Sequence, residues 1–269
     1  MRIGLPKFAE GKNLSGLSQR LREMREASQQ ICQRILEKRN GVIAVYIIGS
    51  VARGDIHEKS DVDIIAVKEQ GNYEEERISP LDFVGKGKGL GISIDIGYIP
   101  LKLWKAELYH SWGSEWESEA SNIIDSIALY DPKGPIEKAK KDFRSYPEEI
   151  RRRSVKSNYN RVVGFGESVW YHYVNKNYDI ESLFSKFFAM EALKILFPIN
   201  RIYLKADKYI FKQIKELERK PPNYLEKCLS LLRFKSQNVD YKEATWLINR
   251  VSEIRKAIEN TINRMGLED

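Results

Sequence analysis

The chain has 269 residues, of which 42% are hydrophobic and 31% are charged, and its net charge is +7. This length suits one large domain or two of ordinary size, and the apolar content is sufficient for a hydrophobic core. No apolar stretch approaches the roughly 20 residues of a membrane-spanning helix, and the first residues lack the apolar segment of a secretory signal peptide. The two cysteines form no CxxC pair, which is typical of reduced thiols. We therefore expect a cytoplasmic protein with no membrane partner.

The first half of the chain alternates predicted helices and strands. Apolar residues at steps of three and four predict a helix over residues 14–39, and Gly41 follows as a stop signal. Runs rich in β-branched and aromatic residues predict strands over 42–48, 61–67, 92–98 and 126–130. The turn sequence DPKG at 131–134 then precedes a predicted helix over 135–145. Residues 69–90 are charged and rich in glycine, and we expect a loop there that is mobile or lines the site.

The second half is expected to be helical. Long apolar patterns with helical spacing follow Tyr146-Pro147. We expect the aromatic residues Phe184, Phe187, Phe188, Tyr209 and Phe211 in the core. The predicted fold class is therefore α+β, with a mixed β-sheet flanked by helices over 1–145 and an all-α bundle over 146–269. The whole charge excess of +7 falls in 146–269. Such a basic region could attract phosphates or nucleic acid, or it could form solvated helix faces.

The segment DVDIIAV places two aspartates on a predicted strand. Because side chains alternate along a strand, Asp61 and Asp63 should project from one face, about 6–7 Å apart, with Val62 and Ile64 on the other face. Two carboxylates at this spacing can hold a pair of metal ions about 3.5–4 Å apart. Magnesium prefers such oxygen ligands and completes its shell with waters and substrate phosphates. The pattern therefore predicts a magnesium site that binds a nucleotide.

A Gly-Ser pair precedes this strand by ten residues. Gly49 ends the strand over 42–48, and a glycine there lets a phosphate approach the backbone closely. Ser50 could cap a short helix whose free N–H groups face an anion, and Arg53 lies one turn further on. The segment GSVARG has the glycine spacing of a P-loop, but Asp55-Ile56 stands where Lys-Ser/Thr is required, so a P-loop is excluded.

A third carboxylate is expected on the strand GISIDIGYIP. Alternation places Asp95 with Ser93 and Gly97 on a polar face, and Ile94 on the opposite face. This strand is expected to neighbour the strand over 61–67. Singly, each of these features is common on protein surfaces; their order along the chain makes the prediction specific.

The combination of Gly-Ser, ten residues, DVDIIAV and a later strand aspartate resembles the DNA polymerase β-type nucleotidyltransferase superfamily. The resemblance covers residues 15–135 and includes the segment ALYDPKG. It is greatest toward small bacterial and archaeal members and antibiotic-modifying nucleotidyltransferases. A looser similarity links LFPINRIYLKADKYI, at 196–210, to two-domain relatives whose helical domain closes over the nucleotide.

The resemblance implies a two-metal mechanism. Asp61 and Asp63 would hold two Mg²⁺ ions, and Asp95 would bind the catalytic ion and help to deprotonate the acceptor hydroxyl. Gly49 and Ser50 would cradle the β- and γ-phosphates of an NTP, with ATP as the first choice. In-line attack at the α-phosphate would transfer AMP to the acceptor and release pyrophosphate.

The nature of the acceptor stays open at the level of sequence. Lys208 is a candidate contact to the triphosphate, with a solvated basic face as the alternative. A small-molecule acceptor is the first hypothesis; the basic half disfavours a polycationic antibiotic unless Glu167, Glu181 or Glu191 forms an acidic pocket. A protein or an RNA end is the second hypothesis, and a non-catalytic nucleotide-binding module is the third. We expect a monomer or a homodimer.

Overall fold

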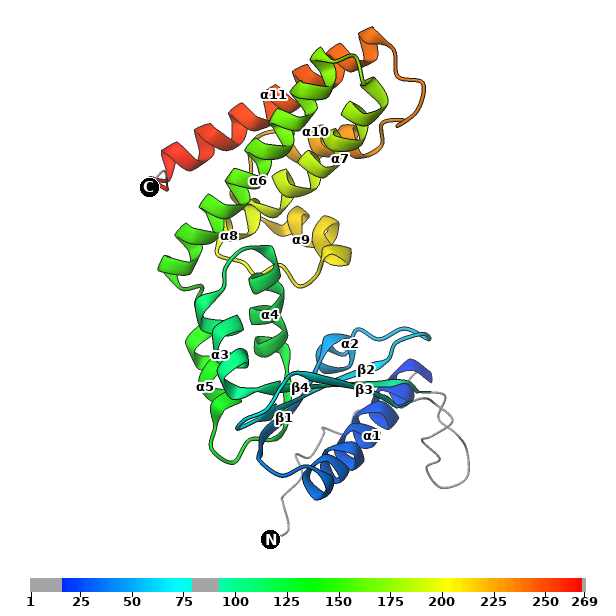
Figure 1. The fold of residues 1–269 in the computed structure, drawn as a ribbon, viewed down its shortest axis with the longest axis vertical. Helices are drawn as coiled ribbons and strands as arrows, with labels where there is room; N and C mark the ends of the chain where they lie inside the picture. Colours follow the sequence, from blue (N-terminus) through cyan, green and yellow to red (C-terminus); the bar gives the residue numbers. More distant parts are fainter. Residues whose placement is uncertain (1–15, 79–91, 268–269) are drawn as a thin grey trace. The chain divides into compact units, whose positions relative to one another are not determined.

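The computed structural model describes residues 16–78 and 92–267 (Figure 1). The chain divides into two compact units. One comprises residues up to 110 together with 119–144, and the other comprises 111–118 together with 145–269. Within the described ranges, no helix combines the length and the apolar character that crossing a bilayer requires.

The first unit is built on a five-stranded mixed sheet with the strand order β3-β4-β2-β1-β5. Among the strands that the structure describes, β2 and β4 pair in parallel and the other neighbours are antiparallel. The elements of this unit in chain order are α1 (Gly16–Lys38), β1 (Val42–Ile48), α2 (Gly49–Arg53), β2 (Val62–Lys68), β3 (Glu74–Ile78), β4 (Ile94–Pro100), α3 (Leu101–His110), most of α4 (Ser114–Asp125), β5 (Ile127–Tyr130) and α5 (Pro135–Phe143).

The two faces of the sheet differ in polarity. Helix α1 lies along one face (Figure 1), where Met24 and Ile31 join a core with Ile64 and Ile94 from the sheet. On the opposite face, the Trp104 indole N–H of α3 donates a hydrogen bond to the Tyr46 hydroxyl, at 2.9 Å. Alternation along the strands therefore separates an apolar face under α1 from a more polar face, as the sequence predicted.

Strand β3 was not predicted. We expected a loop over 69–90, but residues 74–78 pair with β4 and form an edge strand. Its sequence, EEERI, has no apolar alternation: Glu74 and Glu76 have polar or charged partners on one face, and Arg77 pairs with Asp95 on the other. The Arg39 guanidinium contacts the Glu74 carboxylate at 2.8 Å, and the Tyr98 hydroxyl donates to Glu76 at 2.8 Å. Residues 79–90 of the expected loop lie outside the described part of the chain.

The second unit is helical. Its elements are α6 (Glu148–Val174), α7 (Tyr178–Lys194), α8 (Leu196–Asn200), η1 (Asp207–Tyr209), α9 (Ile210–Glu216), α10 (Tyr224–Leu232) and α11 (Tyr241–Arg264). Helices α6, α7 and α11 pack around a core that includes Val162, Phe188 and Leu247. A capping box fixes the start of α11, since Asp240 accepts from the Glu243 N–H and the Glu243 carboxylate accepts from the Asp240 N–H.

The expected aromatic core was wrong at two residues. Phe188 is fully buried and Phe184 is partly buried, but Phe187 is 45% exposed and Phe211 is 39% exposed. Helical spacing brings Phe187 close to the apolar stripe of α7, but the described residues do not cover it. The Phe187 ring packs on one side only, with its centroid 5.7 Å from that of Phe165 and 6.0 Å from that of Phe184.

Candidate active site

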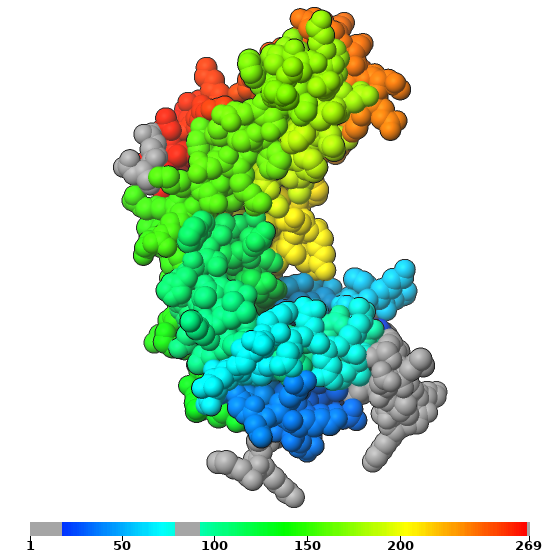
Figure 2. Space-filling view, viewed as in Figure 1, coloured from blue at the N-terminus to red at the C-terminus, as the bar shows by residue number. Residues whose placement is uncertain are grey.

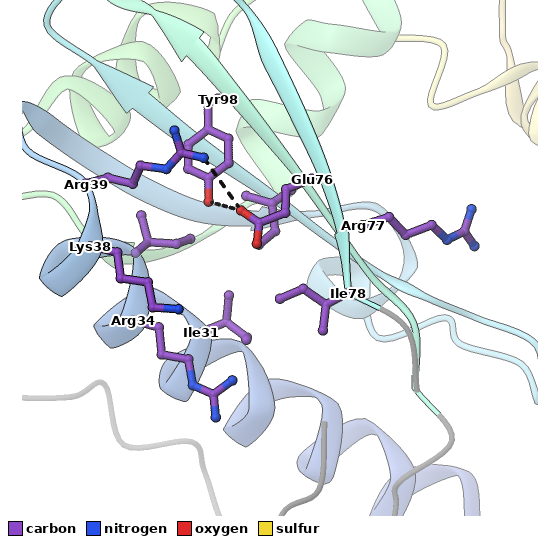
Figure 3. A pocket seen from close by; sticks show the side chains of 10 residues that line it. Ile31, Arg34, Lys38, Arg39, Glu76, Arg77, Ile78 and Tyr98 are labelled. Carbon is purple, nitrogen blue, oxygen red and sulfur yellow. Dashed lines mark hydrogen bonds and ion pairs between the residues drawn. The ribbon is translucent and has the colours of Figure 1, made fainter. Parts of the chain in front are cut away.

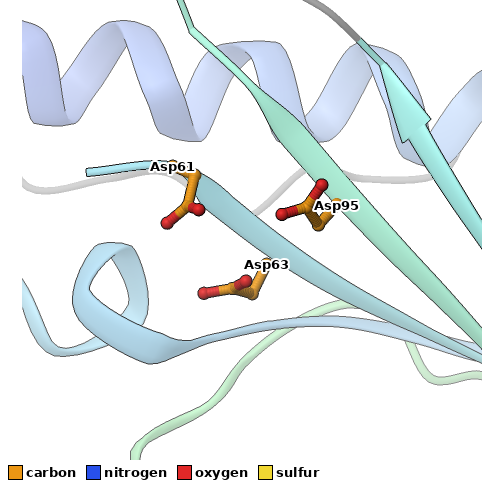
Figure 4. A group of neighbouring side chains, drawn as sticks. All are labelled: Asp61, Asp63 and Asp95. Carbon is orange, nitrogen blue, oxygen red and sulfur yellow. The ribbon is translucent and has the colours of Figure 1, made fainter. Parts of the chain in front are cut away.

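Three carboxylates converge on the polar face of the sheet in the first unit (Figure 4). Asp61 precedes β2, Asp63 lies within it, and Asp95 lies on β4. The parallel register places Asp63 directly opposite Asp95. One carboxylate oxygen from each residue lies within 4.8 Å of the other two, and all three side chains are half-buried. We refer to these residues as the Asp triad.

The burial pattern explains how the strands present the triad. Val62, Ile64 and Ile94 are fully buried under α1, so the alternate positions 61, 63 and 95 face the other way. Three like charges this close repel one another unless cations are present. Carboxylate oxygens are the ligands that hard divalent cations such as Mg²⁺ prefer, so the triad has the donor set of such a site.

Gly49 can lie directly against the triad because it has no side chain. Its φ is +71°, a conformation that L side chains rarely adopt, and a Cβ added there would lie 2.5 Å from the Asp63 Oδ2 atom. The Asp63 carboxylate therefore packs directly on the turn between β1 and α2. The sequence predicted that a backbone approach requires this glycine; the structure shows that the closest group is Asp63 itself.

Ser50 lies in the first turn of α2 and does not cap it. The residue at the N-cap position is Ile48, and no side chain caps this helix, so the expected capping role of Ser50 was wrong. A capping role for Ser50 would require α2 to begin after Ser50. The helix begins at Gly49 instead, so Ser50 is already inside it. The Ser50 side chain is nearly buried, and its carbonyl accepts hydrogen bonds from the N–H groups of Gly54 and Asp55.

Arg53 ends the same short helix and is engaged within the first unit. Its Nε atom lies 3.3 Å from the Asp55 Oδ1 atom, and only 8% of its side chain is exposed. A phosphate contact from Arg53 would require exchange of this partner, and it stays a prediction. Lys208 belongs to the second unit, where its ammonium lies 5.2 Å from the centre of the Tyr209 ring. Its assignment to the nucleotide also stays a prediction.

Sequence reasoning missed two side chains near the triad. Arg77 of β3 pairs in register with Asp95, and its Nε atom lies 3.4 Å from the Asp95 Oδ1 atom. Tyr73 lies over Gly97, and its hydroxyl donates to Glu75 at 2.6 Å. This hydrogen bond raises the pKa of Tyr73 to about 12. The segment EEERI lacks the apolar alternation that marks a strand, so no signal in the sequence placed either side chain near the triad.

A separate pocket of about 400 Å³ lies on the opposite face of the sheet (Figure 3). Its lining includes Arg34 and Lys38 from α1, and Glu76 and Tyr98 from β3 and β4. Arg39 also lines the pocket, and its guanidinium stacks on the Tyr98 ring, 4.6 Å from the ring centre. The Asp triad does not contribute to this pocket, which therefore does not belong to the candidate active site.

Neither Glu181 nor Glu191 forms the acidic pocket that was considered for the second unit. The Glu181 side chain is fully buried, and neither of its carboxylate oxygens has a hydrogen-bond partner among residues 16–78 and 92–267. Burial raises the pKa of Glu181 to about 8. Glu191 is also buried and lies between two cations, with Oε1 at 3.6 Å from the Lys194 Nζ atom and Oε2 at 3.8 Å from an Arg161 nitrogen. Neither group presents a free negative charge to a ligand.

Comparison with known proteins identifies the domain around the triad. Residues 30–86 match the family described as polymerase beta, nucleotidyltransferase, and this segment includes Gly49, Ser50, Asp61 and Asp63. Residues 30–86 are therefore similar to a polymerase β-type nucleotidyltransferase domain, and Asp95 lies outside the matched segment. The family assignment supports nucleotidyl transfer as the class of reaction of this domain. No curated protein gives a significant sequence match.

One solved structure shares the fold of this chain. A nucleotidyltransferase-like protein from Exiguobacterium sibiricum 255-15 has a TM-score of 0.59 at 8% identity, over 88% of this chain and 76% of that one. Spectinomycin adenyltransferase AAD(9) from Enterococcus faecialis, solved with ATP and spectinomycin, has a TM-score of 0.40 at 12% identity, over 88% of this chain and 99% of that one. The first likeness shows a shared fold, and the second is too low to support an argument.

Proposed function

We propose that the protein transfers a nucleoside monophosphate, AMP from ATP, to a hydroxyl group of a small-molecule acceptor and releases pyrophosphate. The observation that carries this proposal is the Asp triad, whose oxygens lie within 4.8 Å of one another in a polymerase β-type domain. A cluster of exposed acidic groups alone would not suffice. The register of β2 and β4 and the packing of Asp63 on Gly49 fix this one in place.

The residues present fit a divalent metal centre. All donors are carboxylate oxygens, they converge, and they remain half-exposed so that an ion and a phosphate can reach them. Mg²⁺ bound there would neutralise the charge that develops on the phosphate and the leaving group. Asp61 and Asp63 would hold two such ions, and Asp95 would join them at the ion nearest the acceptor.

The chain's own groups would position the reactants. The backbone N–H groups of Gly49 and Ser50 would hold the β- and γ-phosphates at the end of β1, with Arg53 and Lys208 as further cationic contacts. The acceptor oxygen would form a bond to the α-phosphorus while the bond from that phosphorus to the β-phosphate oxygen breaks, and pyrophosphate would leave with the electron pair. The hydroxyl proton would pass to the Asp95 carboxylate.

Two other functions use the same residues differently. The excess of positive charge in the helical half favours a protein or an RNA end as the acceptor, through phosphate contacts in the RNA case. A regulatory module that binds a nucleotide without turnover would transfer nothing. Intact, converging carboxylates favour an active site over this last function, because a site released from catalysis would have no reason to keep all three.

Isotope position in the nucleotide tests the proposed reaction. The protein would be incubated with Mg²⁺ and ATP labelled at the α- or the γ-phosphate, together with a small-molecule extract, with protein or with RNA. We expect the α-label to appear on a small molecule, the γ-label to appear in pyrophosphate, and both to vanish with a chelator. Transfer of the γ-label to an acceptor would contradict the proposal, and transfer to protein or RNA alone would select the second function.

A further inference from the structure

Arg77 places a cation on the same face of the sheet as the Asp triad. In Figure 3, Glu76 and Ile78 point toward α1, whereas the Arg77 side chain extends away from α1, although Arg77 also belongs to the lining of the pocket. The antiparallel register of β3 and β4 sets Arg77 opposite Asp95, and the Arg77 Nε atom lies 3.4 Å from the Asp95 Oδ1 atom. The segment that includes β3, cyan in Figure 2, lies at the surface of the first unit.

The strand order assigns a side of the site to each reactant. Across the sheet, β1 leads directly into Gly49, Asp61 precedes β2 and Asp63 lies within it, β4 carries Asp95, and β3 carries Arg77. In the proposed reaction, pyrophosphate leaves on the side of Gly49. In-line displacement places the attacking oxygen on the opposite side of the α-phosphorus, over β4 and β3. The acceptor hydroxyl would therefore approach the α-phosphorus from the side of the sheet on which Arg77 lies.

The ion pair between Arg77 and Asp95 is weak enough for Arg77 to leave Asp95 and bind another anion. The Arg77 side chain is 69% exposed and the Asp95 side chain is 37% exposed, so solvent screens their attraction. Divalent cations on the triad would compete for the same carboxylate. The guanidinium group then presents a planar set of donors that matches a carboxylate or a phosphate.

We propose that Arg77 is an acceptor-binding residue that exchanges Asp95 for a carboxylate or phosphate group of the acceptor, close to the hydroxyl that is attacked. This inference rests on the proposed nucleotidyl transfer, and it names the acceptor class as an anion-bearing hydroxyl compound. Glu75 lies on the same face, in register with Gly97, and its carboxylate accepts from the Tyr73 hydroxyl. The anionic group therefore docks at the Arg77 end of β3, away from Glu75.

Metal binding tests the exchange without any acceptor. Mn²⁺ affinity would be measured by titration calorimetry for the wild type, for Arg77→Gln and for Arg34→Gln. Arg34 lies on the opposite face of the sheet, so its variant removes the same charge away from the triad. We expect Arg77→Gln to bind Mn²⁺ about two- to fivefold more tightly, because the competing guanidinium is gone. Weaker binding in Arg77→Gln would show a purely supporting contact to Asp95 and would overturn the proposal.

Inorganic phosphate serves as the anionic probe for the second half of the exchange. Phosphate affinity would be measured on protein loaded with Mg²⁺ and a non-hydrolysable ATP analogue. We expect Arg77→Gln to weaken phosphate binding about tenfold and Arg34→Gln to leave it unchanged. Equal phosphate affinity in the wild type and Arg77→Gln, or no phosphate binding by the loaded wild type, would overturn the proposal. Failure of the wild type to bind the metal–nucleotide complex would instead reject the proposed function itself.

Discussion

The two units place carboxylates in opposite environments. The Asp triad in the first unit keeps three carboxylates half-exposed and within 4.8 Å of one another. The second unit buries Glu181 completely, with no partner for either oxygen. Close, accessible carboxylates gain from a bound cation, whereas a single buried one gains from a proton. The difference teaches that burial and spacing together, not the count of acidic residues, separate a site for ions from a neutralised core group.

The sharpest way to break this comparison is to neutralise one member of the triad. Asp63→Asn keeps the shape of the side chain and removes its charge. We expect turnover to fall by about a thousandfold or more, because residues that act as one catalytic unit fail together. Steady-state transfer of the α-label measures the effect. Glu69→Gln, an exposed single-charge change in the same unit, is the matched control and should retain activity; near-normal turnover in Asp63→Asn would reject the assignment.

Gly49 offers the next largest effect, on metal affinity and stability together. Gly49→Ala forces a Cβ to within 2.5 Å of Asp63 at a φ of +71°. Gly134 has the same φ of +71°, but nothing lies within 4 Å of its Cβ position. Backbone strain alone should destabilise Gly134→Ala by about 1–2 kcal/mol. Gly49→Ala should lose more and should also lose Mn²⁺ affinity, as urea unfolding and calorimetry would show. Equal losses in both variants would deny any role for the contact with Asp63.

The buried Glu181 predicts a specific dependence of stability on pH. Its pKa rises from the usual 4.5 of an unfolded chain to about 8 on folding, so between these values only the folded state keeps the proton. The free energy of unfolding should therefore decrease as pH rises from 4.5 to 8. Glu181→Gln should be more stable than the wild type at pH 8, on the order of 2 kcal/mol, and similar at pH 4.5. The exposed Glu167→Gln should show no such gain, and a stability loss in Glu181→Gln at pH 8 would contradict the account.

Lys208 is expected to give the smallest effect. A flexible, exposed lysine contributes about two- to fivefold to the affinity for a triphosphate. Lys208→Ala should weaken ATP binding by that factor, and Lys212→Ala, which removes an exposed lysine from α9, should not. Titration of the fluorescence of an ATP analogue measures both. Unchanged affinity in Lys208→Ala would assign this lysine to a solvated face.

The sequence predicted the sheet best where burial is one-sided. Alternation in DVDIIAV and GISIDIGYIP predicted both strands within two residues and the shared face of Asp61, Asp63 and Asp95. It missed β3, because charged partners on both faces replace the apolar alternation that marks a strand. Arg77 was missed with it. The helical unit was predictable as a class, but the burial of Glu181 was not, because helical spacing does not say which acidic residue lies under a neighbouring helix.

Nucleotide binding is the most direct test of the central claim that the Asp triad forms a metal-dependent nucleotidyltransferase site. Thermal unfolding would be measured with each of the four Mg²⁺-NTPs, for the wild type and for an Asp61→Asn/Asp63→Asn double variant. A ligand at about 100 times its Kd stabilises the folded state by about 2.7 kcal/mol. The account predicts a metal-dependent rise of the wild-type midpoint with ATP and none in the variant. An equal rise in both proteins, or no rise with any nucleotide, would contradict it.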